Sequence, residues 1–266
     1  MKLDLNTDRM IAEVEDGIGW VTFNNPARLN AISMEMVEAI PIIFNAFQAD
    51  DSVRVVVTRG AGDRAFVSGA DISEFEEKRS SAQARELYDE QSKAAAAAML
   101  ALDKPTIAMV RGYCIGGGLM MALRADMRIA STNSQFGIPA ARLGLGYGYA
   151  GVTGLVDLVG PAYANEILFS ARRFKADEAL RIGLVNRVVD VDALEDVVRE
   201  LARNIADNAP LTIRAAKFAI REACKDAEQR DMGEIASRVE ACFQSEDFIE
   251  GRRAFMEKRK AVFRGY

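Results

Sequence analysis

Three consecutive glycines at residues 116–118 constrain this chain more than any other feature. They follow an apolar run that ends at Ile115 and precede a short apolar stretch, LMMAL, with helical spacing. Glycine has no Cβ, so this turn lets the backbone approach a ligand closely, and the first N–H groups of the following helix have no partner within it. No lysine follows the glycines, which excludes a phosphate-binding loop. The pattern predicts a strand, a turn and a helix around an anionic group, with close helix-on-strand packing as the alternative.

Charge and composition exclude several classes of partner. The 266 residues carry 34 Lys and Arg against 39 Asp and Glu, a net charge of −5, without a basic tract of the kind that binds nucleic acid. The longest apolar stretch, residues 94–102, is too short to cross a bilayer, and the N-terminal residues carry no apolar leader. The three cysteines form no CxxC pair. We therefore expect a soluble cytoplasmic protein with no nucleic-acid or membrane partner.

The absence of histidine restricts the chemistry. With no histidine in the chain, a Ser-His-Asp or Cys-His nucleophile cannot form, and imidazole metal ligands are missing. We expect no metal site. The remaining acid-base candidates are carboxylates, tyrosines, lysines and Cys114, and Cys114 has no cation beside it in the sequence. A small core residue is the simpler interpretation of Cys114.

Strand and helix patterns alternate along most of the chain. The first 25 residues predict a β-hairpin, residues 53–60 a buried strand, residues 82–102 a long helix and residues 105–110 another strand. This alternation indicates the α/β class. After residue 190 three amphipathic stretches follow without a strand signal. We therefore divide the chain into a core at residues 1–204 and a helical region at residues 205–266.

A second glycine-centred turn suggests what the first one does. FVSGADISEF, at residues 66–75, again passes from an apolar strand end through small residues to a helix start. Two such turns can each direct one backbone N–H at the same oxygen, which makes an oxyanion hole from the main chain alone. This arrangement needs no histidine.

These segments resemble a known family. FVSGADISEF and RGYCIGGGLMMALRADMRIA (111–130) resemble the two glycine segments of the crotonase (enoyl-CoA hydratase/isomerase) superfamily. Further matches cover almost the whole chain: NNPARLNAIS (24–33), SQFGIPAARLGL (134–145), ADEALRIGLVNRVV (176–189) and EGRRAFMEKRKAVF (250–263). The resemblance implies a spiral of ββα units, a helical region that builds homotrimers or dimers of trimers, and an acyl-CoA thioester substrate. Coenzyme A is then part of the substrate, and no separate cofactor is expected.

The resemblance also implies roles for particular residues. By position in the motifs, the oxyanion N–H groups belong to Ala70 and Gly117. The residues that border the acyl-pantetheine channel would be Ser68, Ala70, Asp71, Ile72 and Ser73. Phe255 and Lys258 match positions that reach the CoA nucleotide of a neighbouring subunit. An ordinary amphipathic helix explains these last two equally well.

Two positions depart from the family pattern. Typical hydratases of the family place a glutamate two residues after the third glycine and another directly after the proline of the Q-F-G-x-P segment. In this chain those positions are Met120 and Ala140. Both groups that handle water in a hydratase are absent, so the resemblance does not imply ordinary hydration of an enoyl-CoA.

Decarboxylation of a malonyl-type thioester requires only the oxyanion hole, because loss of CO₂ generates the enolate without a base. The stretch RLGLGYGYAG, at residues 142–151, resembles the L-G-x-x-Y segment of the methylmalonyl-CoA decarboxylases within the family, which places their tyrosine on Tyr147. Those decarboxylases carry a histidine where this chain has Ala70. We expect a decarboxylase with Tyr147 as the proton donor, and Tyr149 is the alternative donor if the segment is extended.

Other functions remain open at this point. A hydratase or isomerase could use relocated carboxylates, for which Asp71, Glu74 and Asp126 are the candidates, although all three suit caps and loop contacts. Arg142 could pair with a substrate carboxylate or lie on the surface. A non-catalytic CoA-binding homologue is the third alternative, and an RNA-binding role is disfavoured by the acidic balance.

Overall fold

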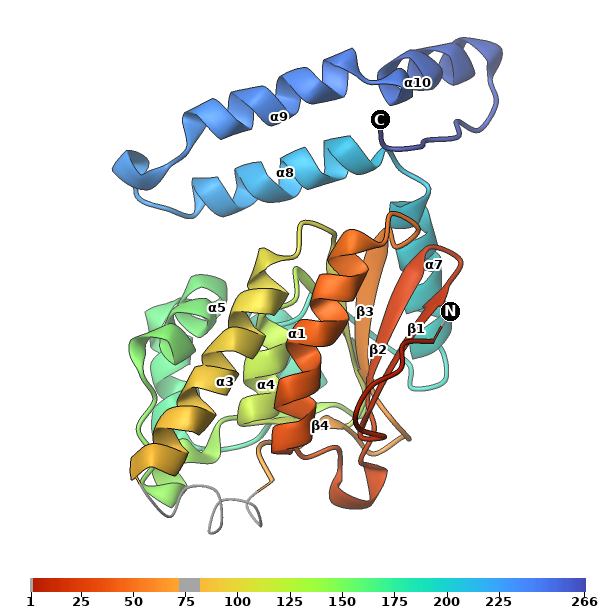
Figure 1. The fold of residues 1–266 in the computed structure, drawn as a ribbon. Coiled ribbons are helices and arrows are strands. Elements are labelled where there is room, and N and C mark those ends of the chain that lie inside the picture. The colour runs from red at the N-terminus through yellow and green to blue at the C-terminus, as the bar shows by residue number, and fades with distance from the viewer. Residues whose placement is uncertain (1, 72–81) are drawn as a thin grey trace.

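A large sheet forms one half of the core in the computed structural model, which describes residues 2–71 and 82–266 (Figure 1). Its strand order is β1-β2-β3-β5-β7-β10. The strands are β1 (Met10–Glu15), β2 (Ile18–Phe23), β3 (Val55–Gly60), β5 (Thr106–Val110), β7 (Met127–Ser131) and β10 (Arg187–Val189). β1 and β2 pair antiparallel as the predicted hairpin, and the remaining neighbours pair parallel.

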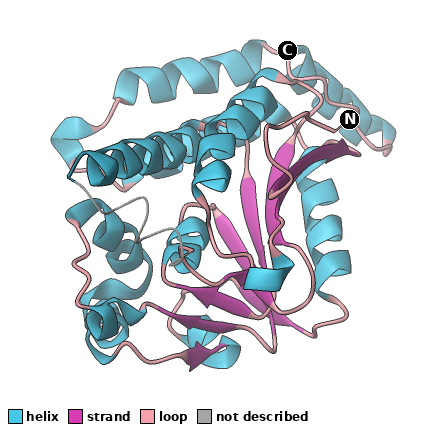
Figure 2. Ribbon diagram, turned by 60° about the horizontal axis from the view of Figure 1, so that its bottom comes forward, coloured by secondary structure: helices cyan, strands magenta, loops and turns pink. Residues whose placement is uncertain are grey.

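A second, smaller sheet consists of very short strands. Its order is β4 (Ala65–Val67), β6 (Tyr113–Ile115), β8 (Gln135–Gly137) and β9 (Phe174–Lys175), and only β9 runs antiparallel to its neighbour. Consecutive strands alternate between the sheets, since β3, β5 and β7 join the large one while β4, β6 and β8 join the small one (Figure 2). This alternation is the expected spiral of ββα units, and the predicted α/β class is confirmed.

Helices cover both faces of the large sheet. α1 (Met34–Ala49) and α3 (Ala82–Ala101) pack together over one face, and α7 (Leu194–Ala206) covers the other with Leu194, Val198 and Ala202 (Figure 1). The remaining core helices are the short α4 (Gly117–Leu123), α5 (Tyr149–Ser170) and α6 (Ala176–Arg181), with short 3₁₀ turns η1 (Pro26–Arg28) and η3 (Pro139–Leu143). α5 bends at Gly160, where a φ of 71° precedes Pro161.

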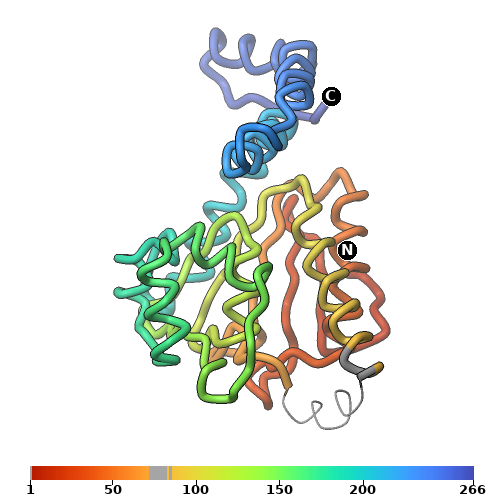
Figure 3. Tube along the Cα trace, turned by 90° about the vertical axis from the view of Figure 1, so that its left-hand side faces the viewer, coloured from red at the N-terminus to blue at the C-terminus, as the bar shows by residue number. Residues whose placement is uncertain are grey.

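Three further helices form a C-terminal lobe that projects from the core (Figure 3). They are α8 (Pro210–Ala223), α9 (Met232–Gln244) and α10 (Glu246–Glu257), with the 3₁₀ turn η4 (Ala227–Gln229) between α8 and α9. Lys217 of α8 ties the lobe to the core, because its buried ammonium donates to the Asp126 carboxylate and to the Lys104 carbonyl oxygen, each at 2.7 Å. The packing therefore places α7 with the sheets and the helices after it in the lobe.

The first turn of α4 lies directly on β4. A methyl group at Gly118 would lie 2.1 Å from the Val67 carbonyl oxygen, whereas Gly116 has a φ of 54° and makes the turn itself. Close helix-on-strand packing is thus the role of Gly118. Gly117 instead faces the backbone nitrogen of Ala70.

Gly118→Ala should destabilise the protein by about 2 kcal/mol or more, because the added methyl must push α4 away from β4. Urea unfolding measures this loss. Gly154→Ala in α5 is the matched control, since a methyl there meets no atom within 4 Å and alanine favours a helix. Equal stability of the two variants would show that the α4–β4 contact is not tight.

Candidate active site

The Ala70 amide is oriented by a neighbouring loop. The chain from β4 runs beside residues 29–32, where the Ile32 N–H donates to the Gly69 carbonyl oxygen at 2.8 Å and the Asp71 N–H donates to the Ile32 carbonyl oxygen at 2.9 Å. Successive groups on an extended chain point to opposite sides, so the Ala70 N–H points away from this loop. Among the described residues it has no acceptor.

Asn30 holds that loop in place. It is fully buried with a φ of 57°, and its amide nitrogen donates to the carbonyl oxygens of Ala61 at 2.9 Å and Ala65 at 2.8 Å. Its amide oxygen accepts from the Asn25 N–H at 3.0 Å. The left-handed backbone and the satisfied amide explain why the turn before Ile32 carries asparagine. Asn30 was not among the residues predicted from the sequence, although its place in NNPARLNAIS was a signal.

Gly117 brings the second amide to the same place. The Gly116 N–H donates to the Gly137 carbonyl oxygen at 2.8 Å, and α4 begins at the next residue, whose N–H has no partner within the helix. A methyl group at Gly117 would lie 3.6 Å from the Ala70 nitrogen. The two turns predicted from the sequence therefore meet, and both residues remain partly accessible.

Two of the predicted channel residues border this meeting point. Ser68 donates its hydroxyl to the Arg28 carbonyl oxygen at 3.3 Å, and Asp71 is buried with its carboxylate 3.0 Å from the Arg28 guanidinium. Asp71 is thus engaged in an ion pair that closes the loop. Ile72 and Ser73 lie outside the described residues, as does the alternative acid Glu74.

Met120, Ala140 and Tyr147 lie on three segments that follow or pack near the glycine turn. Ala140 is buried in η3, next to Pro139, whose ring lies 3.9 Å from the place of a methyl at Gly116. Tyr147 and the end of Met120 converge on Gly151, where a methyl would lie 3.3 Å from the ring and 3.9 Å from Met120 Cε. The two positions where the family pattern has glutamates are therefore apolar: one lies on α4 three residues after Gly117, and the other follows Pro139 in η3.

The two candidate tyrosines differ in exposure. Tyr147 is half-buried against the core, whereas Tyr149 is 87% exposed because it begins α5 rather than continuing an extended strand. Burial raises the pKa of the Tyr147 phenol, and the nearby Tyr88 of α3 raises it further. Tyr147 thus keeps its proton at neutral pH. The proximity of Tyr88 carried no signal in the sequence.

The contacts and exposure of the other polar candidates do not point to a catalytic role. The Asp126 carboxylate accepts from the Thr106 N–H at 2.7 Å and from the Lys217 ammonium, so it joins the core to the lobe. Cys114 is fully buried, and burial raises the pKa of its thiol, which makes it unreactive. Arg142 is exposed on η3.

No group of three or more His, Cys, Asp or Glu residues in residues 2–71 and 82–266 is arranged to hold a metal ion. No helix in the same ranges is long and apolar enough to cross a membrane.

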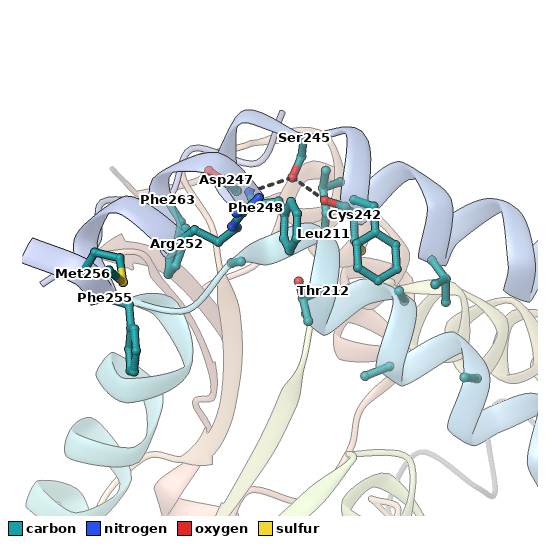
Figure 4. A pocket seen from close by; sticks show the side chains of 17 residues that line it. Leu211, Thr212, Cys242, Ser245, Asp247, Phe248, Arg252, Phe255, Met256 and Phe263 are labelled. Carbon is teal, nitrogen blue, oxygen red and sulfur yellow. Dashed lines mark hydrogen bonds between the residues drawn. The ribbon is translucent and has the colours of Figure 1, made fainter.

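Phe255 and Lys258 lie far from the two amides within one chain. They belong to the C-terminal lobe, at the opposite end of the molecule from β4 (Figure 1). There an apolar cavity of about 980 Å³ opens between α8, α9 and α10, and Figure 4 shows Phe248, Phe255 and Phe263 around it. The structure therefore unites Ser68, Ala70, Asp71 and Gly117 but does not bring the lobe residues to them.

Comparison with known proteins gives the family. Residues 13–266 match the Enoyl-CoA hydratase/isomerase family, and the chain belongs to this family of the crotonase superfamily. It is 36% identical to a short-chain-enoyl-CoA hydratase from Clostridium acetobutylicum over 96% of this chain and 97% of the relative. It is also 36% identical to a crotonyl-CoA hydratase from Syntrophomonas wolfei over 96% and 98% of the two chains.

A solved structure shares the fold closely. The crystal structure of an enoyl-CoA hydratase/carnithine racemase from Magnetospirillum magneticum aligns with a TM-score of 0.90 and 35% identity. The alignment covers 97% of this chain and 96% of that chain.

Gly117→Pro removes one of the two amides and should lower turnover of any acyl-CoA thioester by about 10²-fold or more. Proline is tolerated at the first position of a helix, so α4 should still form. Steady-state turnover tests this, with circular dichroism and thermal unfolding as checks on the fold. Undiminished turnover in a folded variant would show that the Gly117 N–H does not bind the thioester oxygen.

Proposed function

We propose that this chain decarboxylates a malonyl-type acyl-CoA thioester and holds the enolate on the amides of Ala70 and Gly117. One observation carries the proposal: two unpaired amides from separate turns meet, and the two positions where hydratases of the family carry glutamates hold the apolar Met120 and Ala140. A site of this composition can stabilise an oxyanion, but it offers no carboxylate at those positions to move a proton to or from water.

The reaction uses few groups. The thioester oxygen accepts hydrogen bonds from the two amides, and the bond between the α-carbon and the carboxylate breaks. Its electron pair forms the enolate while CO₂ leaves, so no base is needed. The Tyr147 hydroxyl then donates its proton to the α-carbon, and the resulting phenolate takes a proton from water. Each donor of an oxyanion hole contributes about 10² to 10³ in rate.

The apolar surroundings favour this chemistry. A carboxylate loses its charge as CO₂ forms, so an environment that solvates the anion poorly raises the energy of the ground state more than that of the transition state. The apolar Met120 and Ala140, at the positions where the family pattern has glutamates, would provide such surroundings. Glutamates at both positions would instead repel an anionic substrate.

Hydration is the second candidate, and the names of the relatives favour it. The hydratases from Clostridium acetobutylicum and Syntrophomonas wolfei cover nearly the whole chain. Hydration requires a group that activates water. Asp71 is bound to Arg28 and Asp126 to Thr106 and Lys217, so the base would have to come from elsewhere.

Mass spectrometry of the acyl-CoA pool separates the two candidates. The purified protein is incubated with malonyl-, methylmalonyl-, ethylmalonyl-, crotonyl- and 3-hydroxybutyryl-CoA. Loss of CO₂ from one of the malonyl-type thioesters supports decarboxylation. Efficient gain of water by crotonyl-CoA, with every malonyl-type thioester unchanged, would overturn it.

Introducing glutamates at both family positions should replace decarboxylation with hydration. Met120→Glu combined with Ala140→Glu should create hydration of crotonyl-CoA and lower decarboxylation, because the new carboxylates activate water and repel the substrate's charge. Initial rates on both substrates measure the exchange. Leu119→Met, buried one position away, is a control for disturbance of α4. The inference from the missing glutamates is wrong if the unaltered protein already hydrates crotonyl-CoA efficiently.

Tyr147→Phe removes the proposed proton donor while keeping its ring. Turnover of a malonyl-type thioester should fall by about 10² to 10⁴-fold, the usual contribution of a positioned acid, and CoA binding should change little. Tyr149→Phe is the matched control and should be nearly neutral, because that side chain is 87% exposed. Near-normal rates in both variants would mean that water protonates the enolate.

The pH dependence gives an independent test of Tyr147. Only the protonated phenol donates, and its pKa lies above the ordinary value of about 10 because the ring is buried. The rate that depends on Tyr147 should therefore persist through neutral pH and be lost only as the pH rises through that raised pKa. A decline centred between pH 7 and 9 would assign the proton to another group.

The C-terminal lobe supports assembly into a trimer or a dimer of trimers. It exposes large apolar side chains both around its cavity (Val239, Phe243, Phe255 and Met256) and away from it (Ile220 and Ile249). Solvent exposure of this much apolar surface favours its burial between copies of the chain. In such an assembly Phe255 and Lys258 would reach the CoA site of a neighbour.

Light scattering coupled to gel filtration should give the mass of a trimer or hexamer. Ile249→Glu should weaken this assembly, because it places a charge among the exposed apolar side chains of the lobe, whereas Leu180→Glu on α6 should leave it intact. A monomeric unaltered protein at micromolar concentration would refute the assembly.

A further inference from the structure

Arg124 lies on the same face of α4 as Met120. It follows Met120 by four residues, a spacing that puts the two side chains one above the other. The Met120 side chain points toward Gly151 and the Tyr147 ring, so this face is turned toward the proposed acyl site. Side chains of a helix lean toward its N-terminus, which brings the guanidinium back toward Met120.

The Arg124 guanidinium is only partly satisfied. Nη1 donates to the Met120 carbonyl oxygen at 3.1 Å and approaches Met121 Sδ at 3.6 Å. Nε and Nη2 have no acceptor among the described residues, and no carboxylate there pairs with the group. The side chain is half-buried, and burial alone lowers the pKa of its guanidinium.

Two other buried cationic side chains, Arg128 and Lys217, have different hydrogen-bond partners from Arg124. The buried Arg128 donates Nε to the Leu184 carbonyl oxygen at 2.8 Å and Nη1 to the Ala125 carbonyl oxygen at 2.7 Å. Lys217 has a carboxylate partner. Arg124 has one carbonyl acceptor and no carboxylate partner among the described residues, and its contact with Met120 is the helix-end contact of a basic residue, which uses only one of the guanidinium nitrogens. A half-buried guanidinium whose other N–H groups are not bound by the protein can accommodate a carboxylate.

We propose that Arg124 binds a carboxylate at the far end of the acyl chain, so that the enzyme prefers acyl-CoA thioesters whose short acyl group ends in a carboxylate. This rests on the proposed function in one respect, that the thioester oxygen lies on Ala70 and Gly117. Met120 follows Gly117 by three residues, about 4.5 Å along the helix. The guanidinium beside the Met120 carbonyl thus suits a carboxylate about one helical turn beyond the oxyanion amides. The carboxylate lost in decarboxylation is a different group, at the α-carbon.

Calorimetric binding of two saturated thioesters tests the proposal. The acyl groups of glutaryl-CoA and pentanoyl-CoA have five carbons each, but only the glutaryl group ends in a carboxylate. Neither carries an α-carboxylate or a double bond. The unaltered protein should bind glutaryl-CoA about tenfold or more tightly than pentanoyl-CoA. Arg124→Met should abolish this preference while leaving the affinity for pentanoyl-CoA within about twofold. Arg124→Lys should retain part of it.

The outcomes separate this proposal from the proposed function. Equal affinities for the two thioesters in the unaltered protein would overturn the role of Arg124 and leave the thioester site standing. Equal weakening of both ligands by Arg124→Met would also overturn it, since a purely structural role predicts that result. Failure of both thioesters to bind would contradict the acyl-CoA site itself. Neither ligand can be decarboxylated or hydrated by the proposed chemistry, so the result does not depend on which reaction occurs.

Discussion

The close contact between α4 and β4 is the constraint on which the site depends. Gly118 lies so near the Val67 carbonyl oxygen that no side chain fits between them. This contact fixes where α4 begins, and therefore where the Gly117 amide points relative to Ala70. The loop held by Asn30 fixes the other amide. The two turns that carry the amides are thus held by a glycine contact and one buried asparagine amide.

The chemistry follows from what surrounds those amides. Met120 and Ala140 leave the immediate surroundings apolar, and Tyr147 supplies a hydroxyl that burial keeps protonated. The nearby carboxylates Asp71 and Asp126 are engaged in ion pairs that hold loops and helices together. The combination favours a reaction that creates an enolate without a base. Arg124 adds a cationic group one turn along the same helix and gives the site a preference for an anionic acyl chain.

Much of the large sheet could be predicted from the sequence because its strands are long and apolar enough to show their period. β3 and β5 are clear examples. The strands of the smaller sheet have only two or three residues, too few for any pattern, so their pairing emerges from the structure.

The two glycine turns could be recognised in the sequence because only glycine allows the backbone to come so close to a neighbouring group. Their meeting was predicted from the need for two donors and from the family resemblance. Side-chain surroundings were harder to foresee. The extended conformation considered for residues 147–149 was wrong, because Gly148 caps α5 and Tyr149 turns to solvent. Arg124 carried a usable signal, a charge four residues after Met120 on an otherwise apolar helix, and was overlooked.

Infrared spectroscopy of a bound thioester tests the central claim most directly. Pentanoyl-CoA labelled with ¹³C at the thioester carbonyl reports on hydrogen bonds to its oxygen. Two amide donors should shift the carbonyl stretch of the bound ligand to lower frequency than in water, and Gly117→Pro should remove part of that shift. A bound carbonyl that absorbs at its frequency in water, in a protein that binds the ligand, would contradict the assignment of Ala70 and Gly117.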